Sequence, residues 1–149
     1  LFAAHDLDRE YLAITSGTTK PAMISTPYGR NPGDRVKFTS RTGDRQARTR
    51  VTVIEALEGA TLVGCRLETG RTHQIRVHLT EQLGTPVIGD TLYGKPPAKG
   101  LVAEIWRSLG HQALHAHVLG FVHPVTKKTM RWQSEPPADF QSALVRLRG

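Results

Sequence analysis

The sequence predicts a single α+β domain, built on mainly antiparallel strands with a few short helices. Three observations support this prediction. The 149 residues suit one domain. Segments with strand-like alternation outnumber segments with a helical period. Most of the strand-like segments are separated by short turns, which join antiparallel neighbours. No repeat, low-complexity tract or linker divides the chain, so we treat residues 1–149 as one domain.

The first half of the chain contains most of the expected strands. Residues 11–15 are apolar and β-prone, and a Ser-Gly pair ends them. Residues 18–46 are polar and rich in Gly, Pro and Arg, which predicts loops or a hairpin. Residues 47–57 alternate as a strand does. Residues 61–67 suit an antiparallel partner for it, across a turn at residues 58–60.

A change of period marks the first helix. From Ile75 onward, apolar side chains recur every four residues, which predicts a helix over residues 73–83. Thr72 can cap the first turn, and Gly84 can take the left-handed conformation after the last one.

The second half continues with short elements. Residues 101–109 suit a short helix, and residues 113–122 and 129–133 suit two strands joined by a turn. A Pro-rich segment at residues 135–140 leads into a final short helix.

The charge balance indicates a polyanionic partner. Lys and Arg number 20 against 13 Asp and Glu, which gives a net charge of +7 and an isoelectric point of about 10.1. Nucleic acid is therefore favoured over the simpler reading of a protein that is merely basic. No apolar run is long enough to span a membrane. Cys65 is the single cysteine, so we expect a reducing, cytoplasmic setting and a buried, inert thiol.

Residues 69–79, Thr-Gly-Arg-Thr-His-Gln-Ile-Arg-Val-His-Leu, are the most informative segment. They combine two arginines, two histidines and a glutamine with a glycine at a predicted helix start. This number of donors exceeds what a buried core needs. It suits a site for an anion, a carboxylate or a nucleic-acid backbone.

Metal and cofactor sites have little support in the sequence. His73 and His78 are five residues apart and fall on different sides of a helix, whereas His115 and His117 share one strand face. A zinc site needs three or four converging ligands, so we interpret this pair as packing or hydrogen-bonding residues. No nucleotide-binding glycine motif and no serine-hydrolase motif is present.

Three further residues have ordinary structural interpretations when they are considered singly. Asp90 precedes a turn-like segment and is expected to be a turn aspartate rather than a catalytic carboxylate. Tyr11 suits a half-buried strand position, and Leu114 suits the core.

Several blocks in a fixed order change these interpretations. Their order along the chain is Tyr-Leu-Ala-Ile from residue 11, Ala-Arg-Thr from 47, Arg-Leu-Glu-Thr-Gly-Arg-Thr-His-Gln-Ile-Arg-Val-His-Leu from 66, Gly-Thr-Pro-Val-Ile-Gly-Asp-Thr-Leu-Tyr-Gly from 84, Leu-His-Ala-His-Val-Leu from 114, His-Pro-Val-Thr from 123 and Pro-Pro-Ala-Asp-Phe from 136. Over residues 2–140 the chain resembles the RluA-type pseudouridine synthase family.

The resemblance implies an activity and a fold. It implies isomerisation of uridine to pseudouridine in structured RNA, either ribosomal RNA or tRNA. The family cleaves the N-glycosidic bond, turns the base and rejoins it through carbon, with an aspartate as nucleophile and with neither metal nor cofactor. The expected fold has antiparallel sheets side by side, flanking a central cleft. We expect a cytoplasmic monomer with no membrane association.

The resemblance also implies site residues. Tyr11 is expected to stack on the base and to take part in proton transfer, and Arg76 to pair with the catalytic aspartate. We expect Leu114 to pack against the site, with Arg71 and His73 at its rim. The RNA-binding set comprises Arg71, His73, Arg30 and Leu114.

One family block does not stand in its usual place. The block with the catalytic aspartate, His-Arg-Leu-Asp-x-x-Thr-Ser-Gly, precedes the Tyr-Leu-Ala strand by a few tens of residues in the family. Here His-Asp-Leu-Asp at residues 5–8 resembles it, but six residues rather than two separate Asp8 from Thr15. We interpret Asp8 as a surface acid.

The chain is therefore expected to be part of a catalytic domain and to be inactive without an upstream segment. A non-catalytic RNA-binding relative is the alternative, and a metal-dependent hydrolase is a third class that chelation would reveal.

Overall fold

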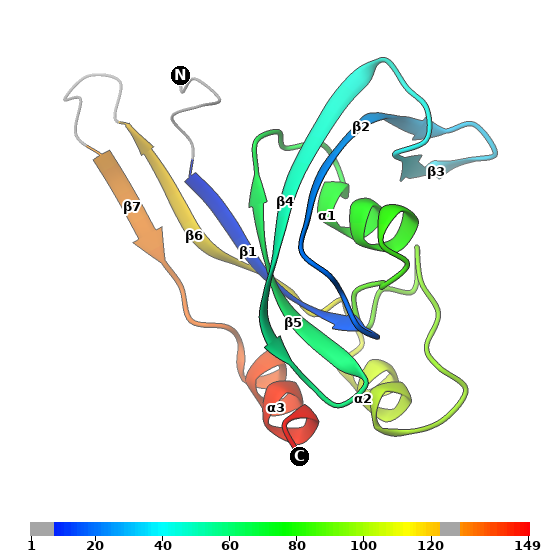
Figure 1. Ribbon diagram of the computed structural model, residues 1–149, viewed down its shortest axis with the longest axis vertical. Helices are drawn as coiled ribbons and strands as arrows, with labels where there is room; N and C mark the ends of the chain where they lie inside the picture. Colours follow the sequence, from blue (N-terminus) through cyan, green and yellow to red (C-terminus); the bar gives the residue numbers. More distant parts are fainter. Residues whose placement is uncertain (1–7, 123–128) are drawn as a thin grey trace.

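A computed structural model describes residues 8–122 and 129–149 of the chain, with side chains over residues 9–117 and 134–149. Within this part the strands form one seven-stranded sheet in the order β3-β2-β4-β5-β1-β6-β7, and neighbouring strands pair antiparallel. Figure 1 shows the strands splaying apart at one end, while α2 and α3 pack near the other. The elements in chain order are β1 (Asp8–Ser16), β2 (Ala22–Asn31), β3 (Asp34–Thr39), β4 (Arg45–Ala56), β5 (Ala60–Leu67), α1 (Gln74–Val77), η2 (His78–Gln82), α2 (Leu101–Leu109), β6 (Leu114–Val122), β7 (Thr129–Gln133) and α3 (Ala138–Leu147).

The predicted fold class is confirmed, and the arrangement of the sheet is now defined. The described strands are mainly long and antiparallel, and the helices are few and short. The resemblance implied sheets lying side by side, and hydrogen bonding joins their strands into a single curled sheet. None of the helices in the described ranges is long and apolar enough to cross a membrane.

Residues 18–46 hold more regular structure than their composition suggested. They form the β2–β3 hairpin, and β2 alternates buried and exposed side chains along its length. Its inward residues include Thr26 and Tyr28, which carry polar atoms, so the apolar alternation that marks a strand is weak there. Of the two predicted alternatives, loops or a hairpin, the hairpin is present.

The helix predicted over residues 73–83 is present in two short parts. The α-helix α1 continues directly into the π-helix η2, a rare geometry that often occurs at functional sites. Gly84 follows with a φ of 69°, as predicted. The expected cap at Thr72 is wrong: His73 occupies the cap position in the left-handed region, at φ 56°, and makes no side-chain capping bond.

The register of three strands places Tyr11 on the same face as this helix. Val51 of β4 pairs with Cys65 of β5, which in turn pairs with Tyr11 of β1. Directly paired residues point to the same side of a sheet. The face that carries Val51, Cys65 and Tyr11, which we call the inner face, also carries Thr49, whose side chain contacts His78 of η2.

A connecting segment positions the residues that follow the helix. Ile88 N donates to Ile14 O at 2.9 Å, and Ala113 N donates to Ile88 O at 2.9 Å, so this segment lies between β1 and the start of β6. Val87 and Ile88 are fully buried as a result. This segment therefore places Asp90 on the inner-face side of the sheet.

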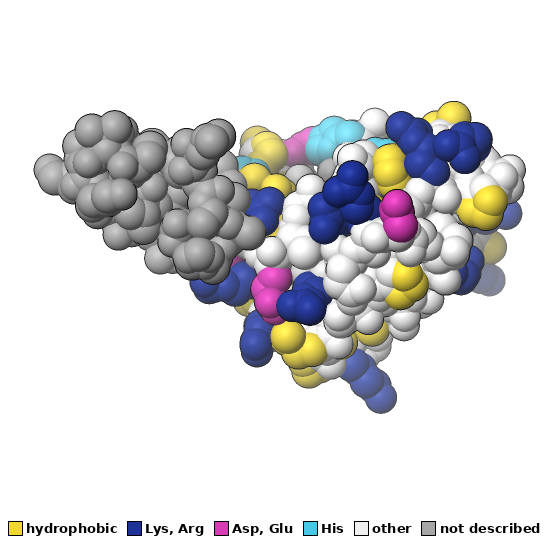
Figure 2. All heavy atoms as spheres, turned by 90° about the horizontal axis from the view of Figure 1, so that it is seen from above, with side chains coloured by type: hydrophobic (Ala, Val, Ile, Leu, Met, Phe, Trp, Pro, Cys, Tyr) yellow, Lys and Arg dark blue, Asp and Glu magenta, His cyan; other side chains and the backbone are white. Residues whose placement is uncertain are grey.

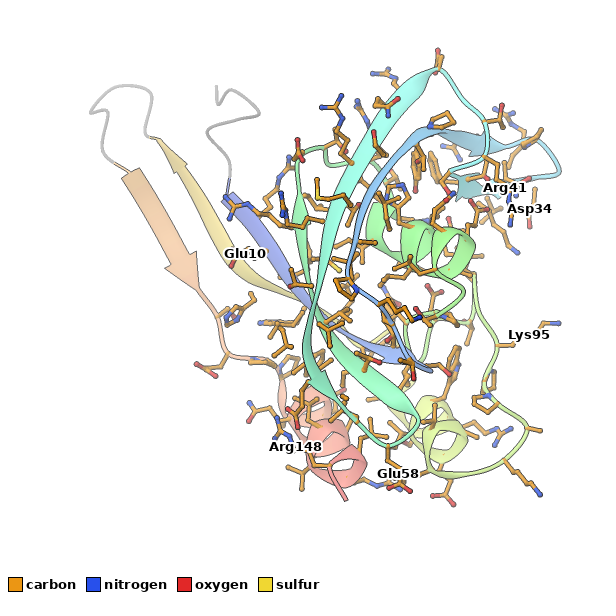
Figure 3. The ribbon with its side chains drawn as sticks, viewed as in Figure 1. Glu10, Asp34, Arg41, Glu58, Lys95 and Arg148 are labelled. Carbon is orange, nitrogen blue, oxygen red and sulfur yellow. The ribbon has the colours of Figure 1, made fainter. Side chains whose placement is uncertain are left out.

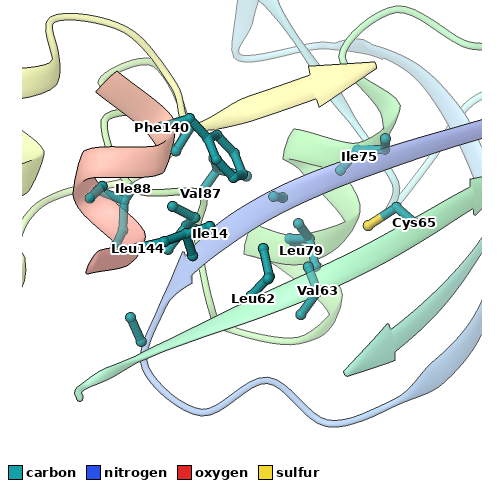
Figure 4. Close-up of a cluster of buried hydrophobic side chains, with 14 of the residues drawn as sticks. Ile14, Leu62, Val63, Cys65, Ile75, Leu79, Val87, Ile88, Phe140 and Leu144 are labelled. Atoms are coloured by element: carbon teal, nitrogen blue, oxygen red, sulfur yellow. The ribbon is translucent and has the colours of Figure 1, made fainter. Parts of the chain in front are cut away.

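The main core lies between the sheet and its helices (Figure 4). Helix α3 contributes Phe140 and Leu144, which join Ile14 and Leu62 from the central strands. Figure 3 shows Glu58 and Arg148 together near this end of the molecule. Glu58 N donates to Leu147 O at 3.0 Å, which fixes the β4–β5 turn against the last turn of α3.

Cys65 is buried in this core, as predicted. Burial raises the pKa of its thiol to about 12, so the thiol stays protonated and unreactive at neutral pH. Residues 5–7 and 123–128, which include Asp6 of the His-Asp-Leu-Asp segment and the His-Pro-Val-Thr block, lie outside the described residues, as does the side chain of Asp8.

Candidate active site

One hollow on the inner face brings together all the predicted site residues except Arg30. It has a volume of about 230 Å3. Strand β1 provides Tyr11, the turn before α1 provides Arg71 and His73, α1 provides Arg76, and β6 provides Leu114. The rest of the lining is Leu67, Gln74, Ile75 and Gln112. A volume below the ~300–1,000 Å3 of drug-sized ligand sites suits a single base.

Asp90 holds the guanidinium of Arg76 from one side. Arg76 Nε lies 2.9 Å from Asp90 Oδ2, and Arg76 Nη2 lies 2.9 Å from Asp90 Oδ1, which makes a bidentate pair. The carboxylate is fully buried and the arginine side chain is 13% exposed. The hydrogen bonds that Arg76 donates to Asp90 raise the pKa of Arg76 further, so it remains charged.

This pair adds a contact that the sequence reasoning did not assign to either residue. Arg76 was expected to face a carboxylate that the chain does not supply, yet Asp90 supplies one. Asp90 is also the predicted turn aspartate, because its Oδ1 accepts the N–H groups of Leu92 and Tyr93. The Nη1 atom of Arg76 has no hydrogen bond within the described part of the chain, and Arg76 lines the hollow.

His73 and Tyr93 form the wall beside this pair. Tyr93 Oη accepts Phe38 N–H at 2.9 Å, so its own proton is available for His73 Nδ1, at 2.7 Å. The ring of Tyr93 lies beneath the Arg76 guanidinium, 5.2 Å from its centroid to Cζ. Burial and the charge of Arg76 lower the pKa of His73, which is therefore neutral at pH 7.

The positive φ of His73 adds backbone strain at this wall. Non-glycine residues seldom adopt this conformation, and strain of this kind concentrates at functional sites. The strained turn directs both Arg71 and His73 toward the hollow.

Gln74 fixes the shape of the turn before α1. Its Oε1 accepts Thr69 Oγ1–H at 2.7 Å and Arg71 N–H at 3.0 Å. Its Nε2 donates to Arg48 O at 2.8 Å and to Thr49 Oγ1 at 2.9 Å. The side chain is buried, so the turn is tied to β4 by a fully bonded amide.

His78 has a structural environment although it belongs to the same segment. It is fully buried, with Nε2 at 2.8 Å from Thr26 Oγ1 and Nδ1 at 2.8 Å from Thr49 Oγ1. Burial lowers its pKa to about 4. The prediction that His73 and His78 lie on different sides of the helix is confirmed.

Arg30 lies away from the hollow, on β2. Its Cζ stacks 4.8 Å from the centroid of the Phe38 ring, and its Nη1 donates to Arg35 O at 2.7 Å. Phe38 contacts His73 edge-on, with centroids 5.8 Å apart, so Arg30 stands behind the wall of the site rather than in it. Exposed basic side chains continue along this part of the sheet: Arg35, Arg45, Arg48 and Arg50.

The predicted role of His115 and His117 as hydrogen-bonding residues agrees with the structure. Both rings contact Ser134 O, at 3.1 and 3.0 Å. Across the described ranges, no group of three or more His, Cys, Asp or Glu could hold a metal ion.

A second hollow, of about 390 Å3, opens on the opposite face of the sheet. Leu12, Ile54 and Gly64 line it, with Arg50 and the Arg66–Glu10 pair around it. It is larger than the inner hollow. It has no counterpart to the bidentate, buried pair of Arg76 and Asp90, so we place the site on the inner face.

Basic side chains are also prominent on the surface. Figure 2 shows Lys and Arg distributed over the face seen from above, with few acidic side chains among them. This distribution suits a polyanion near the splayed end of the sheet.

Comparison with known families identifies the chain. The RNA pseudouridylate synthase family model matches residues 1–81. The chain belongs to this family. It is 40% identical to the ribosomal large subunit pseudouridine synthase D of Xanthomonas campestris pv. campestris, over 98% of the chain and 46% of that protein. It is 33% identical to the chloroplastic RNA pseudouridine synthase 2 of Arabidopsis thaliana, over 99% of the chain and 40% of that protein.

Solved structures support the family fold. Human RNA pseudouridylate synthase domain containing 1 superposes with a TM-score of 0.71 at 26% identity, over 89% of the chain and 56% of that structure. Human RNA pseudouridylate synthase domain containing 4 superposes with a TM-score of 0.70 at 24% identity, over 95% of the chain and 62% of that structure. The chain spans less than half the length of the curated relatives described above.

The sequence reasoning missed Asp90 and Tyr93 as site residues. A signal was present, because both belong to the Gly-Asp-x-x-Tyr-Gly block that carried part of the family resemblance. The sequence analysis used that block only to recognise the family. In the structure, Asp90 accepts hydrogen bonds from Arg76, and Tyr93 Oη is hydrogen-bonded to His73 Nδ1.

Proposed function

We propose that the protein converts specific uridines in structured RNA to pseudouridine at the inner hollow. One observation carries the proposal: Arg76 lines the same hollow as Tyr11, and its guanidinium is fixed from one side by buried Asp90. A fixed, permanently charged donor beside an aromatic ring suits a site that holds a carboxylate and a base together.

Each residue has a defined part in this reaction. The free donors of Arg76 hold the nucleophilic aspartate, and a carboxylate beside a guanidinium stays ionised at neutral pH. Tyr11 stacks on the base once it has left the RNA stack, which is worth about 1–3 kcal/mol. Exchange of the C1′–N1 bond for a C1′–C5 bond requires C5 to lose a proton and N1 to gain one. Tyr11 takes part in this transfer.

We propose that an upstream segment provides the aspartate, and that residues 1–149 alone are inactive. The catalytic domain then comprises this chain and that segment. Two features support the proposal: the curated relatives are longer than the chain, and Arg76 keeps a donor that Asp90 does not use.

The substrate is proposed to be ribosomal RNA or tRNA, and large-subunit ribosomal RNA is the first to test. The supporting observations are the name of the Xanthomonas relative and the net charge of +7. Arg71 and His73 contact the RNA at the rim, Leu114 packs against the base, and Arg30 contacts the backbone outside the hollow. We propose that the protein acts as a cytoplasmic monomer without a metal or cofactor.

The test compares the chain with a longer protein that carries an upstream His-x-Leu-Asp segment. Both are incubated with unmodified ribosomal RNA, and pseudouridine is mapped by sequence position. We expect product only from the longer protein. In that protein, Arg76→Ala should lower the rate by at least about 10²–10³-fold, the cost of losing one preorganised charged donor.

Arg107→Ala is the matched control, since Arg107 is an exposed arginine on α2 that does not line the hollow. Full turnover by Arg76→Ala would defeat the assignment. RNA binding without any product from the longer protein would favour the non-catalytic alternative. Loss of activity with a chelator would indicate a metal-dependent enzyme.

A further inference from the structure

Arg9 lies against the turn that carries Arg71, a lining residue of the inner hollow, and has no role in the reaction described above. It precedes Tyr11 by two residues on β1, so both side chains point to the inner face. Its guanidinium lies against Gly70, where a Cβ atom would come within 2.1 Å of Arg9 Nη1 and 3.2 Å of Arg9 Cζ. Gly70 separates Thr69 from Arg71, so Arg9 and Arg71 flank the same turn.

The absence of a side chain at residue 70 leaves room for the guanidinium of Arg9. Gly70 does not belong to the glycines with positive φ, so its backbone conformation does not require glycine. The nearest obstacle to a Cβ atom is the end of the Arg9 side chain rather than the backbone. A side chain at residue 70 would therefore displace the guanidinium of Arg9 from its present position.

The two terminal donors of Arg9 are available to a ligand. Nη1 and Nη2 make no hydrogen bond in the described part of the chain and are not among its buried unpaired atoms, whereas Nε is buried there without a partner. The neighbouring Arg71 donates only its Nε there, to Gln46 O at 3.0 Å. Two cations that flank one turn repel each other. An anion that binds between the two side chains offsets this repulsion.

We propose that Arg9, resting on Gly70, forms a phosphate subsite with Arg71 for the RNA backbone next to the target uridine. The inference rests on the proposed function and adds a contact that holds the nucleotide while its base enters the hollow. A phosphate matches the planar fork of arginine through two parallel hydrogen bonds. The subsite positions the RNA and does not touch the reacting atoms.

Single methylphosphonate linkages, which remove one backbone charge at a time, test the subsite. They are placed around the target uridine of an RNA hairpin, and affinity is measured for the longer protein. We expect one linkage next to the uridine to weaken wild-type binding by about 10-fold, a value typical of one lost charged hydrogen bond. Arg9→Ala should weaken binding of unmodified RNA by a similar factor and should be insensitive to that linkage.

Two variants sharpen the test. Gly70→Ala should displace Arg9 and reproduce the loss, and the double variant Arg9→Ala with Gly70→Ala should lose no more than either single one. The slope of log affinity against log salt should become shallower by about 0.7–0.9 in Arg9→Ala. Arg107→Ala removes the same charge elsewhere and should keep the sensitivity to methylphosphonate.

Two outcomes would overturn the subsite. One is that Arg9→Ala remains as sensitive to the neutral linkage as wild type. The other is that Arg9→Ala lowers thermal stability with unchanged RNA affinity, which would mean that Arg9 pairs with a carboxylate of the protein. In either case, continued dependence of pseudouridine formation on Arg76 would leave the proposed function standing. Loss of that dependence would remove both proposals.

Discussion

Residues 69–79 contain two kinds of polar side chain, and the difference lies in whether their hydrogen-bonding capacity is filled. Gln74 and His78 are buried, and protein partners occupy their polar atoms. Arg71 and Arg76 face the hollow, and each is held on one side only. The first pair stabilises the fold, and the second pair leaves donors for a ligand.

The comparison shows that the number of polar side chains in residues 69–79 does not by itself mark a binding site. The number of donors in this segment was expected to exceed the needs of a core, and that is wrong for Gln74 and His78. A π-helix beside a sheet with inward threonines needs buried polar partners, since Thr26 and Thr49 must satisfy their hydroxyls. Donors without a protein partner, rather than the number of donors, distinguish the residues of the site from the residues that stabilise the fold around it.

The largest expected effect comes from removing the carboxylate of Asp90, which fixes the orientation of the Arg76 guanidinium. Asp90→Ala removes both acceptors and leaves the guanidinium free to rotate within a partly buried site. In the longer protein with the upstream segment, we expect the rate of pseudouridine formation to fall by about 10²-fold, because a misplaced catalytic group costs this much. The fold should also lose stability, as it does when one partner of a buried pair is removed.

Asp90→Asn is the control, because its amide oxygen can still accept one bond. Its rate and its melting temperature should lie between those of wild type and Asp90→Ala. An unchanged rate in Asp90→Ala would mean that Arg76 needs no support from Asp90. It would also remove the main example of an arginine that is fixed on one side and leaves donors for a ligand.

The sequence predicts the local features of this site well and its long-range contacts poorly. Alternation and turn signals locate β1, β4 and β5, and the period-four apolar positions locate α1 and η2. The pairing of Arg76 with Asp90 depends on how the segment through Val87 lies against β1, which local patterns do not encode. Family resemblance brought Tyr11 and Arg76 together, but it did not show which acceptors surround them.

An effect of intermediate size is expected from His78, whose hydrogen-bonding atoms have protein partners. The effect is a loss of folding stability at low pH. Burial depresses the pKa of His78 to about 4, against about 6.5 when the chain is unfolded. The unfolded state therefore binds more protons below pH 6.5, and the folded state loses stability as the pH falls toward 4. At about 1.36 kcal/mol for each pKa unit, the loss is about 3 kcal/mol.

Denaturant unfolding of wild type and His78→Gln between pH 7 and pH 4 measures this loss. Carboxylates, including nearby Glu81, contribute to both slopes, so the difference between the two proteins isolates His78. We expect the wild type to lose more stability on acidification than the variant, even though the variant starts lower at pH 7. Parallel curves would show that His78 titrates normally and is not held neutral by burial.

The smallest effect on stability is expected from an exposed ion pair, His111 with Asp139. His111 Nε2 lies 2.6 Å from Asp139 Oδ2, and the side chains are 52% and 44% exposed. The hydrogen bonds to Gln112 and Asp139 raise the pKa of His111, and the bond from His111 lowers the pKa of Asp139. The stabilisation from His111 is full below its unfolded pKa near 6.5 and is lost as the pH rises through its folded pKa. That from Asp139 is full above about 3.9 and is lost as the pH falls through its folded pKa.

Asp139→Asn should therefore lower stability most between about pH 4 and pH 6.5, the unfolded pKa values of the two groups, and by no more than the ~0.2–1 kcal/mol usual for exposed pairs. The pair ties the first turn of α3 to the segment just after α2, so melting temperature at pH 5.5 and pH 8.5 is a suitable measurement. A difference from wild type that persists at pH 8.5 would show that Asp139 acts through the helix start rather than through His111. High salt should remove a true ion-pair effect at pH 5.5 and should leave the His78 effect largely intact, since screening acts on exposed charges far more than on buried ones.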